Sequence, residues 1–196
     1  MAIGGNHRKF QAIRQLFAIL GEPRATRREN MADHLLGVNA RLRDNHRRGG
    51  PLETHIVEIA GTDTAALREC HHIRHEVFCA EQGVAEALEW DGLDTTCRHF
   101  LIFADGVAAG TARLRPYKPG LAKIERVAVL KRFRGLGLGR RLMVQLIAQA
   151  RNGHQEAILN AQTAVRDFYA ALGFAAEGPE FEEANIPHVH MRLKLR

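Results

Sequence analysis

The stretch VLKRFRGLGLGRRLM, from Val129 to Met143, is the part of the sequence that most constrains the fold. Gly135, Gly137 and Gly139 alternate there among basic residues, directly before an apolar pattern of helical period. Glycine at this density costs conformational entropy, so the backbone must need its freedom there. The first N–H groups of a helix have no partner inside it, and the helix dipole adds about half a positive charge. The pattern therefore predicts a strand, a glycine turn and a helix that bind an anion such as phosphate.

The glycine run does not match the two best-known phosphate motifs. A Walker A loop ends in Gly-Lys-Ser/Thr, whereas Arg140 and Arg141 follow the last glycine here. A dinucleotide fingerprint needs GxGxxG and an acidic partner, and this chain has GxGxG without that acid. Taken alone, the run is also compatible with a basic loop in front of a surface helix.

The positive charge of the chain is confined to its first quarter. The chain has 196 residues and a net charge of +6. Residues 1–50 hold ten Lys and Arg against four Asp and Glu, and residues 51–196 hold eighteen of each. Because the larger part is electrically balanced, we do not expect nucleic acid as a partner.

Composition also bounds the compartment. Cys70, Cys79 and Cys97 form no CxxC pair, so neither a disulfide framework nor a zinc site is expected. No apolar run approaches the roughly 20 residues that span a bilayer, so we expect no membrane partner. These features predict reduced thiols and a cytoplasmic protein.

Residues 1–50 are predicted to form a basic helical extension. Phe10, Ile13, Phe17 and Leu20 repeat at helical spacing, and RRGGP at 47–51 has the composition of a linker. The extension could pack on the main domain or on a partner chain, act as a targeting segment, or offer a surface to an anionic partner. Because an amphipathic arm can join two copies, we include a homodimer among the expected partners.

Residues 51–196 are predicted to form a second, α+β domain. Asp105-Gly106 is the pair favoured in a two-residue turn, so the residues around it predict a hairpin. Consecutive hairpins followed by strand–helix units predict a mixed, mostly antiparallel sheet with helices on both faces. The expected strands are 54–60, both arms of 99–115, 122–130, 157–160 and two near the C-terminus, and the expected helices are 63–79, 137–151 and 163–172.

Two blocks of this domain resemble the GNAT superfamily of N-acetyltransferases. VAVLKRFRGLGLGRRLM resembles its coenzyme-A motif, with Arg134-x-x-Gly137-x-Gly139 after a strand. LNAQTAVRDFYAALGF, at 159–174, is similar to the next family block. IRHEVFCAEQ and NIPHVHMRL look like the ElaA-like branch, and the resemblance covers 54–195.

The resemblance implies a GNAT-like acyl-CoA N-acyltransferase fold that uses acetyl-CoA as cosubstrate. In such folds two neighbouring parallel strands splay apart, and the pantetheine lies in the gap like an added strand. Val127 and Val129 would offer it backbone hydrogen bonds, Asn160 would contact the coenzyme arm, and the loop amides would hold the pyrophosphate. The implied coenzyme-binding residues are Val127, Ala128, Val129, Arg134, Gly135, Leu136, Gly137, Leu138, Gly139, Arg140 and Asn160.

Transfer of an acetyl group to an amine needs a proton acceptor and a proton donor. Lys-like amines have a pKa near 10.4, so the attacking ammonium must lose a proton at neutral pH. Glu125 lies on the strand that would line the cleft and is the candidate base, with an ion pair to Lys123 or Arg126 as its structural alternative. Tyr169 occupies the family's general-acid position, and its neutral phenol can donate to the leaving sulfur.

Three further residues are candidates for contact with the acceptor. His188 precedes the last strand and could contact substrate or relay a proton, or be a structural histidine at the strand edge. Asp91 and Asp94, in the acidic stretch EWDGLD, could attract a cationic amine or serve turn geometry. His71, His72 and His75 share one helix, but no second ligand element is evident, so no metal is expected.

The acceptor is expected to be a small-molecule amine rather than a protein, attacked directly in a ternary complex. Two alternatives stay open. RHEVF, EWDGLD and AGTARLRP also resemble acyl-homoserine-lactone synthases, which typically lack the full glycine loop. The chain could also be a non-catalytic module that senses acyl-CoA.

Overall fold

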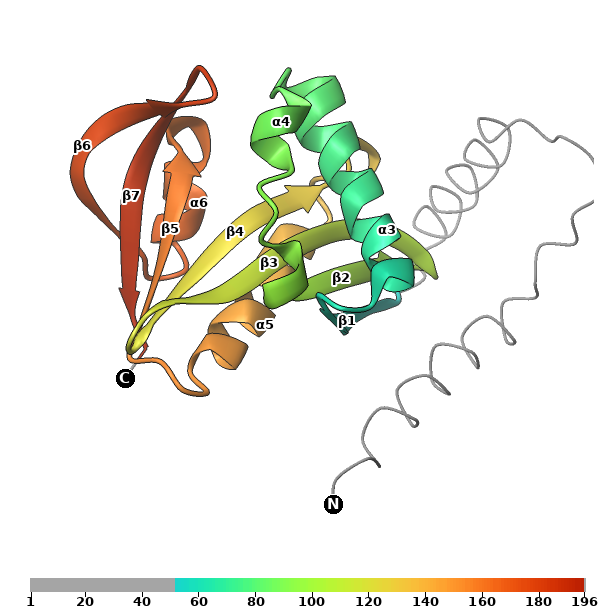
Figure 1. Ribbon diagram of the computed structural model, residues 1–196, viewed down its shortest axis with the longest axis horizontal. Helices are drawn as coiled ribbons and strands as arrows, with labels where there is room; N and C mark the ends of the chain where they lie inside the picture. Colours follow the sequence, from blue (N-terminus) through green and yellow to red (C-terminus); the bar gives the residue numbers. More distant parts are fainter. Residues whose placement is uncertain (1–51, 196) are drawn as a thin grey trace, which may run out of the picture. The chain divides into compact units, whose positions relative to one another are not determined.

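The computed structural model describes residues 52–195, so the expected helical extension at 1–50 and the linker at 47–51 lie outside the described residues. Figure 1 shows one twisted sheet with α3 in front of it and α5 behind it. Seven strands follow the order β1-β2-β3-β4-β5-β7-β6. They are β1 (Thr54–Ala60), β2 (Arg98–Ala104), β3 (Val107–Lys118), β4 (Leu121–Val129), β5 (Glu156–Gln162), β6 (Ala175–Glu183) and β7 (Ile186–Lys194).

All neighbouring strands are antiparallel except β4 and β5, so the predicted mixed, mostly antiparallel sheet with helices on both faces is confirmed. The predicted Asp105-Gly106 turn joins β2 to β3, and both residues have positive φ, as a two-residue hairpin turn requires. No helix within 52–195 is long and apolar enough to cross a bilayer. The helices are α3 (Thr64–Arg74), α4 (Glu86–Glu89), α5 (Leu138–Ala150) and α6 (Arg166–Ala170), with a π-helix η1 (His75–Glu81) and 3-10 turns η2 (Asp94–Thr96), η3 (Lys131–Phe133) and η4 (Thr163–Val165).

The long helix predicted at 63–79 is two elements in the structure. Asp63 accepts a hydrogen bond from the amide of Ala66 and caps α3, and the chain then continues as the π-helix η1 without a break. Apolar residues of α3, such as Leu67 and Ile73, pack into the same core as the central strands and α5. The widened η1 turn brings Val77 and Phe78 to the edge of the cleft described below.

The pairing between β4 and β5 stops after three residue pairs. Leu121, Ala122 and Lys123 pair with the start of β5, and beyond them the two parallel strands diverge (Figure 1). On its other side, β4 carries a bulge in which Arg126 and Val127 lie opposite the single residue Ala112 of β3. Arg126 has a φ of 54°, the left-handed value that marks the bulge. The divergence and the bulge together fix the position of the functional site.

Candidate active site

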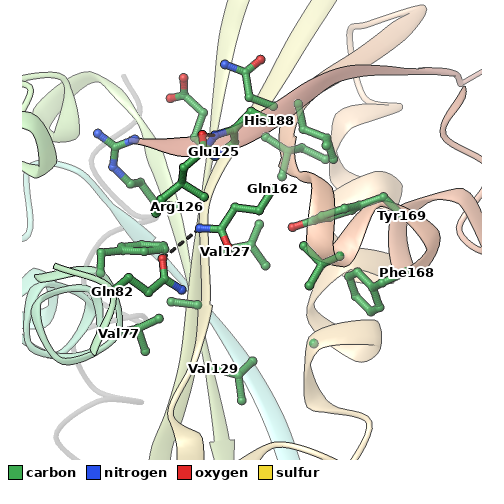
Figure 2. Close-up of a pocket in the computed structure, with 18 of the residues that line it drawn as sticks. Val77, Gln82, Glu125, Arg126, Val127, Val129, Gln162, Phe168, Tyr169 and His188 are labelled. Carbon is green, nitrogen blue, oxygen red and sulfur yellow. Dashed lines mark hydrogen bonds between the residues drawn. The ribbon is translucent and has the colours of Figure 1, made fainter. Parts of the chain in front are cut away.

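A cleft of about 820 Å³ opens between the diverging strands β4 and β5. The floor is β4 from Lys123 to Val129, and the walls come from η1, α6 and the hairpin that joins β6 to β7. Figure 2 shows Val127 and Val129 of β4 along the floor, with Tyr169 and Phe168 on one side and Val77 and Gln82 on the other. A groove with these dimensions can hold an extended arm between the strands and a second molecule at its far end.

The mouth of the cleft is built from unpaired main-chain amides. Gly135 and Gly137 have φ values of 80° and 76°, and α5 begins at Leu138. Within residues 52–195, the amides from 135 to 140 donate to no backbone or side-chain acceptor, and the first helical bond runs from Arg141 to Gly137. A Cβ at Gly135 or Gly137 would meet no atom within 4 Å, so the left-handed backbone, not crowding, requires glycine there. These amides and the helix dipole make an anion site that faces the cleft.

Tyr169 projects from α6 into the cleft (Figure 2). Its side chain is 8% exposed, and its ring packs edge-on against Phe168 and Phe174. Burial raises the pKa of the phenol to about 12, so it stays protonated over the physiological range. Within the described residues its hydroxyl has no hydrogen-bond partner, which leaves the proton available to a molecule in the cleft.

Residues 61–195 match the protein family described as the acetyltransferase (GNAT) domain. This chain belongs to the GNAT acetyltransferase family. The Bacillus subtilis protein YyaT is 38% identical over 138 residues, which cover 68% of this chain and 93% of YyaT.

Solved GNAT-type structures share the fold. An acyl-CoA N-acyltransferase from Pseudomonas aeruginosa is 29% identical, with a TM-score of 0.64 over 72% of this chain and 99% of that one. Escherichia coli ElaA is 24% identical, with a TM-score of 0.66 over 72% of this chain and all of ElaA. The expected resemblance to ElaA is therefore confirmed at the level of the fold.

The GNAT domain brings most of the predicted coenzyme-binding residues to one cleft. All of the residues named for this role line it except Leu136, which packs against the core instead. Arg134 lines the cleft, and its guanidinium pairs with Glu81 of η1 at 2.6 Å. Its Nε also donates to the carbonyl of Val129, so Arg134 ties the loop to β4 and η1. Arg140 remains exposed at the mouth of the cleft.

Asn160 lies in the cleft but is engaged by the β6–β7 hairpin. Its Nδ2 donates to Glu183 at 2.9 Å, and its Oδ1 accepts from Nδ1 of His190 at 2.8 Å. Asn160 therefore fastens β5 to the hairpin, and its position in the cleft is compatible with the predicted contact to the coenzyme arm.

Glu125 is an ion-pair partner rather than a poised base. Its carboxylate lies 2.9 Å from Arg113, 3.0 Å from Arg115 and 3.0 Å from Lys123. Burial alone would raise its pKa, but the hydrogen bond from Arg115 and the charges of Arg113 and Lys123 hold the pKa at about 2. A carboxylate with so low a pKa accepts protons poorly at neutral pH, so this assignment is corrected.

Asp91 and Asp94 do not form an acidic rim for substrate. Neither lines the cleft, and both bind Arg113, whose side chain is completely buried in β3. Asp94 also binds Arg74 at 2.8 Å, and Asp91 binds Arg126 at 3.2 Å. Burial opposes ionisation, but the arginine hydrogen bonds outweigh it and lower the pKa of both carboxyl groups. Their negative charges neutralise guanidinium groups that would otherwise be buried without a counter-charge.

His188 lines the cleft from β7, near Glu125 and Gln162 in Figure 2. Its Nδ1 lies 2.7 Å from the carbonyl of Ile186, and a carbonyl can only accept. The hydrogen bond therefore places a proton on Nδ1, and within the described residues Nε2 has no hydrogen-bond partner. Phe181 stacks on the ring with centroids 5.9 Å apart, and the side chain is only 9% exposed.

Sequence reasoning missed a carboxamide bridge in the cleft. Nε2 of Gln162, the last residue of β5, donates to Oε1 of Gln82 at the end of η1 at 2.8 Å (Figure 2). Gln162 is the last residue of the strand that borders the splayed gap, and this position in the sequence could have identified it as a cleft residue.

The histidines considered for metal form side-chain pairs instead: His71 with Asp94, and His75 with Glu86.

We expect Glu125→Gln to lower the free energy of unfolding by about 2–4 kcal/mol at pH 7. The substitution removes the carboxylate that neutralises three buried or half-buried cations. The pKa of Glu125 is lowered on folding, so its contribution is present above the unfolded pKa near 4.5 and is lost as pH falls toward 2. Urea unfolding at pH 7 and pH 3 should therefore show a smaller difference from the wild type at pH 3. Glu180→Gln, on the exposed strand β6, is the control. Unchanged stability at pH 7 would contradict the ion-pair role.

Proposed function

We propose that this GNAT domain transfers an acetyl group from acetyl-CoA to a primary amine in the cytoplasm, by direct attack in a ternary complex. The observation that carries the proposal is the row of unpaired amides at 135–140, at the mouth of a groove between two diverging parallel strands. An anion with two adjacent phosphates suits the mouth, and an extended arm suits the groove. Coenzyme A combines both features.

The floor of the groove supports this placement of the arm. Within residues 52–195, β4 has no strand partner on its β5 side beyond Lys123, so its backbone groups there can bond an extended ligand as they would bond a strand. The Val129 carbonyl already accepts from Arg134, which leaves the backbone groups nearer the bulge for the thioester end. The carbonyl carbon of the thioester would then lie near Val127, within the part of the cleft that Tyr169 enters.

Two residues supply the proton transfers of the proposed reaction. The amine nitrogen forms a bond to the acetyl carbon, the carbon–sulfur bond breaks, and the thiolate takes a proton. Tyr169 donates that proton, since its raised pKa keeps the phenol neutral. Nε2 of His188 accepts the proton that the attacking ammonium loses, in place of Glu125. Solvent then restores both groups.

Coenzyme binding tests whether the unpaired amides at 135–140 hold the phosphates. Acetyl-CoA at saturating concentration should raise the Tm of the full chain, because a ligand that binds only the folded state stabilises it. Gly137→Glu should abolish this shift, since it places a carboxylate at the anion site on a left-handed backbone. Gly153→Glu is the matched control: Gly153 is also left-handed, meets no neighbour and lies at the far end of α5. An unchanged shift in Gly137→Glu would overturn the placement of the coenzyme.

Thiol release from acetyl-CoA across a panel of amines separates the proposal from its alternatives. Release that depends on an amine supports acetyl transfer. Stabilisation by S-adenosylmethionine would favour the homoserine-lactone synthase, and coenzyme binding without release for any amine would favour a sensor.

Replacement of either proton-transfer residue should lower kcat. Tyr169→Phe should lower kcat by about 100-fold and leave the Kd for acetyl-CoA unchanged, because the phenol acts on the leaving sulfur. His188→Gln should lower kcat at saturating amine, because the imidazole that accepts the proton is gone. The Tyr169 pKa of about 12 predicts no alkaline loss of wild-type activity below about pH 11. Wild-type kcat in either variant would contradict its assigned role.

A further inference from the structure

Glu183 differs from the other carboxylates of the cleft. Three carboxylates line it: Glu89, Glu125 and Glu183. Glu89 binds Arg74 and Arg126, and Glu125 binds two arginines and a lysine. Within residues 52–195, Glu183 has no cation within ion-pairing distance, and its hydrogen bond is to the neutral amide of Asn160. Glu183 is solvent-exposed at the rim of the cleft, and its negative charge has no ionic partner there.

The carboxylate of Glu183 is oriented by a hydrogen bond from a side chain of β5. Asn160 donates to it at 2.9 Å, and Asn160 is itself oriented by His190 at 2.8 Å. The ring of His190 stacks on Phe181 with centroids 4.4 Å apart. Ala184 and Asn185 then turn the chain with φ values of 53° and 60°, and a left-handed Ala is a strained feature that the hairpin maintains. A carboxylate positioned in this way loses little freedom when it binds a cation.

The cleft has opposite charges at its two ends. Unpaired amides and Arg140 make the mouth attractive to anions. The hairpin end carries Glu183 and, on the exposed strand β6, Glu180 and Glu182, which have no ion-pair partner within the described residues. The phosphates of the coenzyme therefore belong at the mouth, and a cation belongs at the hairpin.

Glu183 and His188 are spaced to bind one short molecule. Asn160, which holds the Glu183 carboxylate, pairs with His190, and Gln162 pairs with His188 two residues away on β7. Two residues of a strand rise about 7 Å, so the carboxylate lies about that far along the sheet from the imidazole. Both side chains line the same cleft. An acceptor that reaches both groups carries two amines separated by a few carbon atoms.

We propose that the acceptor is a short diamine, or an amine with a second cationic group, whose far ammonium binds Glu183 while the near amine attacks the thioester. This inference rests on the proposed function, because it assigns the second charge of that same acceptor. Amines without a second cation would enter the cleft without this anchor and bind more weakly.

The test compares diaminobutane with butylamine, which lacks only the second amine, as acceptors with acetyl-CoA. Wild-type kcat/KM should be roughly three- to tenfold higher for diaminobutane, the range expected of a partly solvated charge pair. Glu183→Gln should remove this preference by raising KM for diaminobutane, so that the two amines are acetylated with equal kcat/KM. Glu182→Gln is the matched control, because it removes the same charge from the neighbouring residue, which does not line the cleft. Added salt should reduce the preference of the wild-type protein for diaminobutane over butylamine, because salt screens the charge pair.

Calorimetric titration of both amines into the protein with coenzyme A gives a readout that needs no turnover. Weaker diaminobutane binding in Glu183→Gln, with neither amine acetylated, would support the cation site at Glu183 and overturn the proposed acetyl transfer. Acetylation of both amines at equal kcat/KM, or a preference that survives Glu183→Gln, would overturn the inference and leave the proposed function standing. No diaminobutane binding in the wild type would also overturn the inference.

Discussion

The divergence of β4 from β5 after Lys123 is the constraint on which the rest of the site depends. Parallel strands usually pair along their length, because unpaired backbone groups in a protein interior are costly. Here pairing stops after three residue pairs, and in the described part of the chain β4 continues to Val129 without a partner on that side. The structure thus leaves backbone donors and acceptors open along a groove that ends at the free amides of α5. A ligand with an extended arm and an anionic head satisfies both.

A buried ionic network holds the divergent strand in place. The guanidinium of Arg113, on β3, is fully buried and binds Asp91, Asp94 and Glu125. Asp91 in turn binds Arg126, the residue that forms the bulge of β4. Removal of one member would leave a charge uncompensated in a poorly solvated place, so the network resists partial loss. Asp91 and Asp94, which the sequence suggested for substrate binding, therefore help to hold β4 in its bulged conformation instead.

The elements set by local rules could be predicted from the sequence. The Asp105-Gly106 hairpin, the glycine turn before α5 and the placement of Tyr169 follow from turn chemistry, helix ends and a family pattern. The partners of charged side chains could not be predicted, because they come from distant strands. Glu125 meets Arg113 only through the antiparallel register of β3 and β4. The π-helix η1 and the hairpin that positions Glu183 likewise depend on tertiary packing, which the local sequence pattern does not predict.

The central claim is that the main-chain amides from 135 to 140 hold the diphosphate of an acyl-CoA. Backbone amide NMR of the full chain, titrated with acetyl-CoA, tests it most directly. We expect the largest amide shifts, and new protection from hydrogen exchange, at Gly135–Arg140 and along β4 from Ile124 to Val129. Saturable binding that leaves these resonances in place would contradict it, with shifts found instead at a separate pocket lined by Thr54, His55 and Arg141.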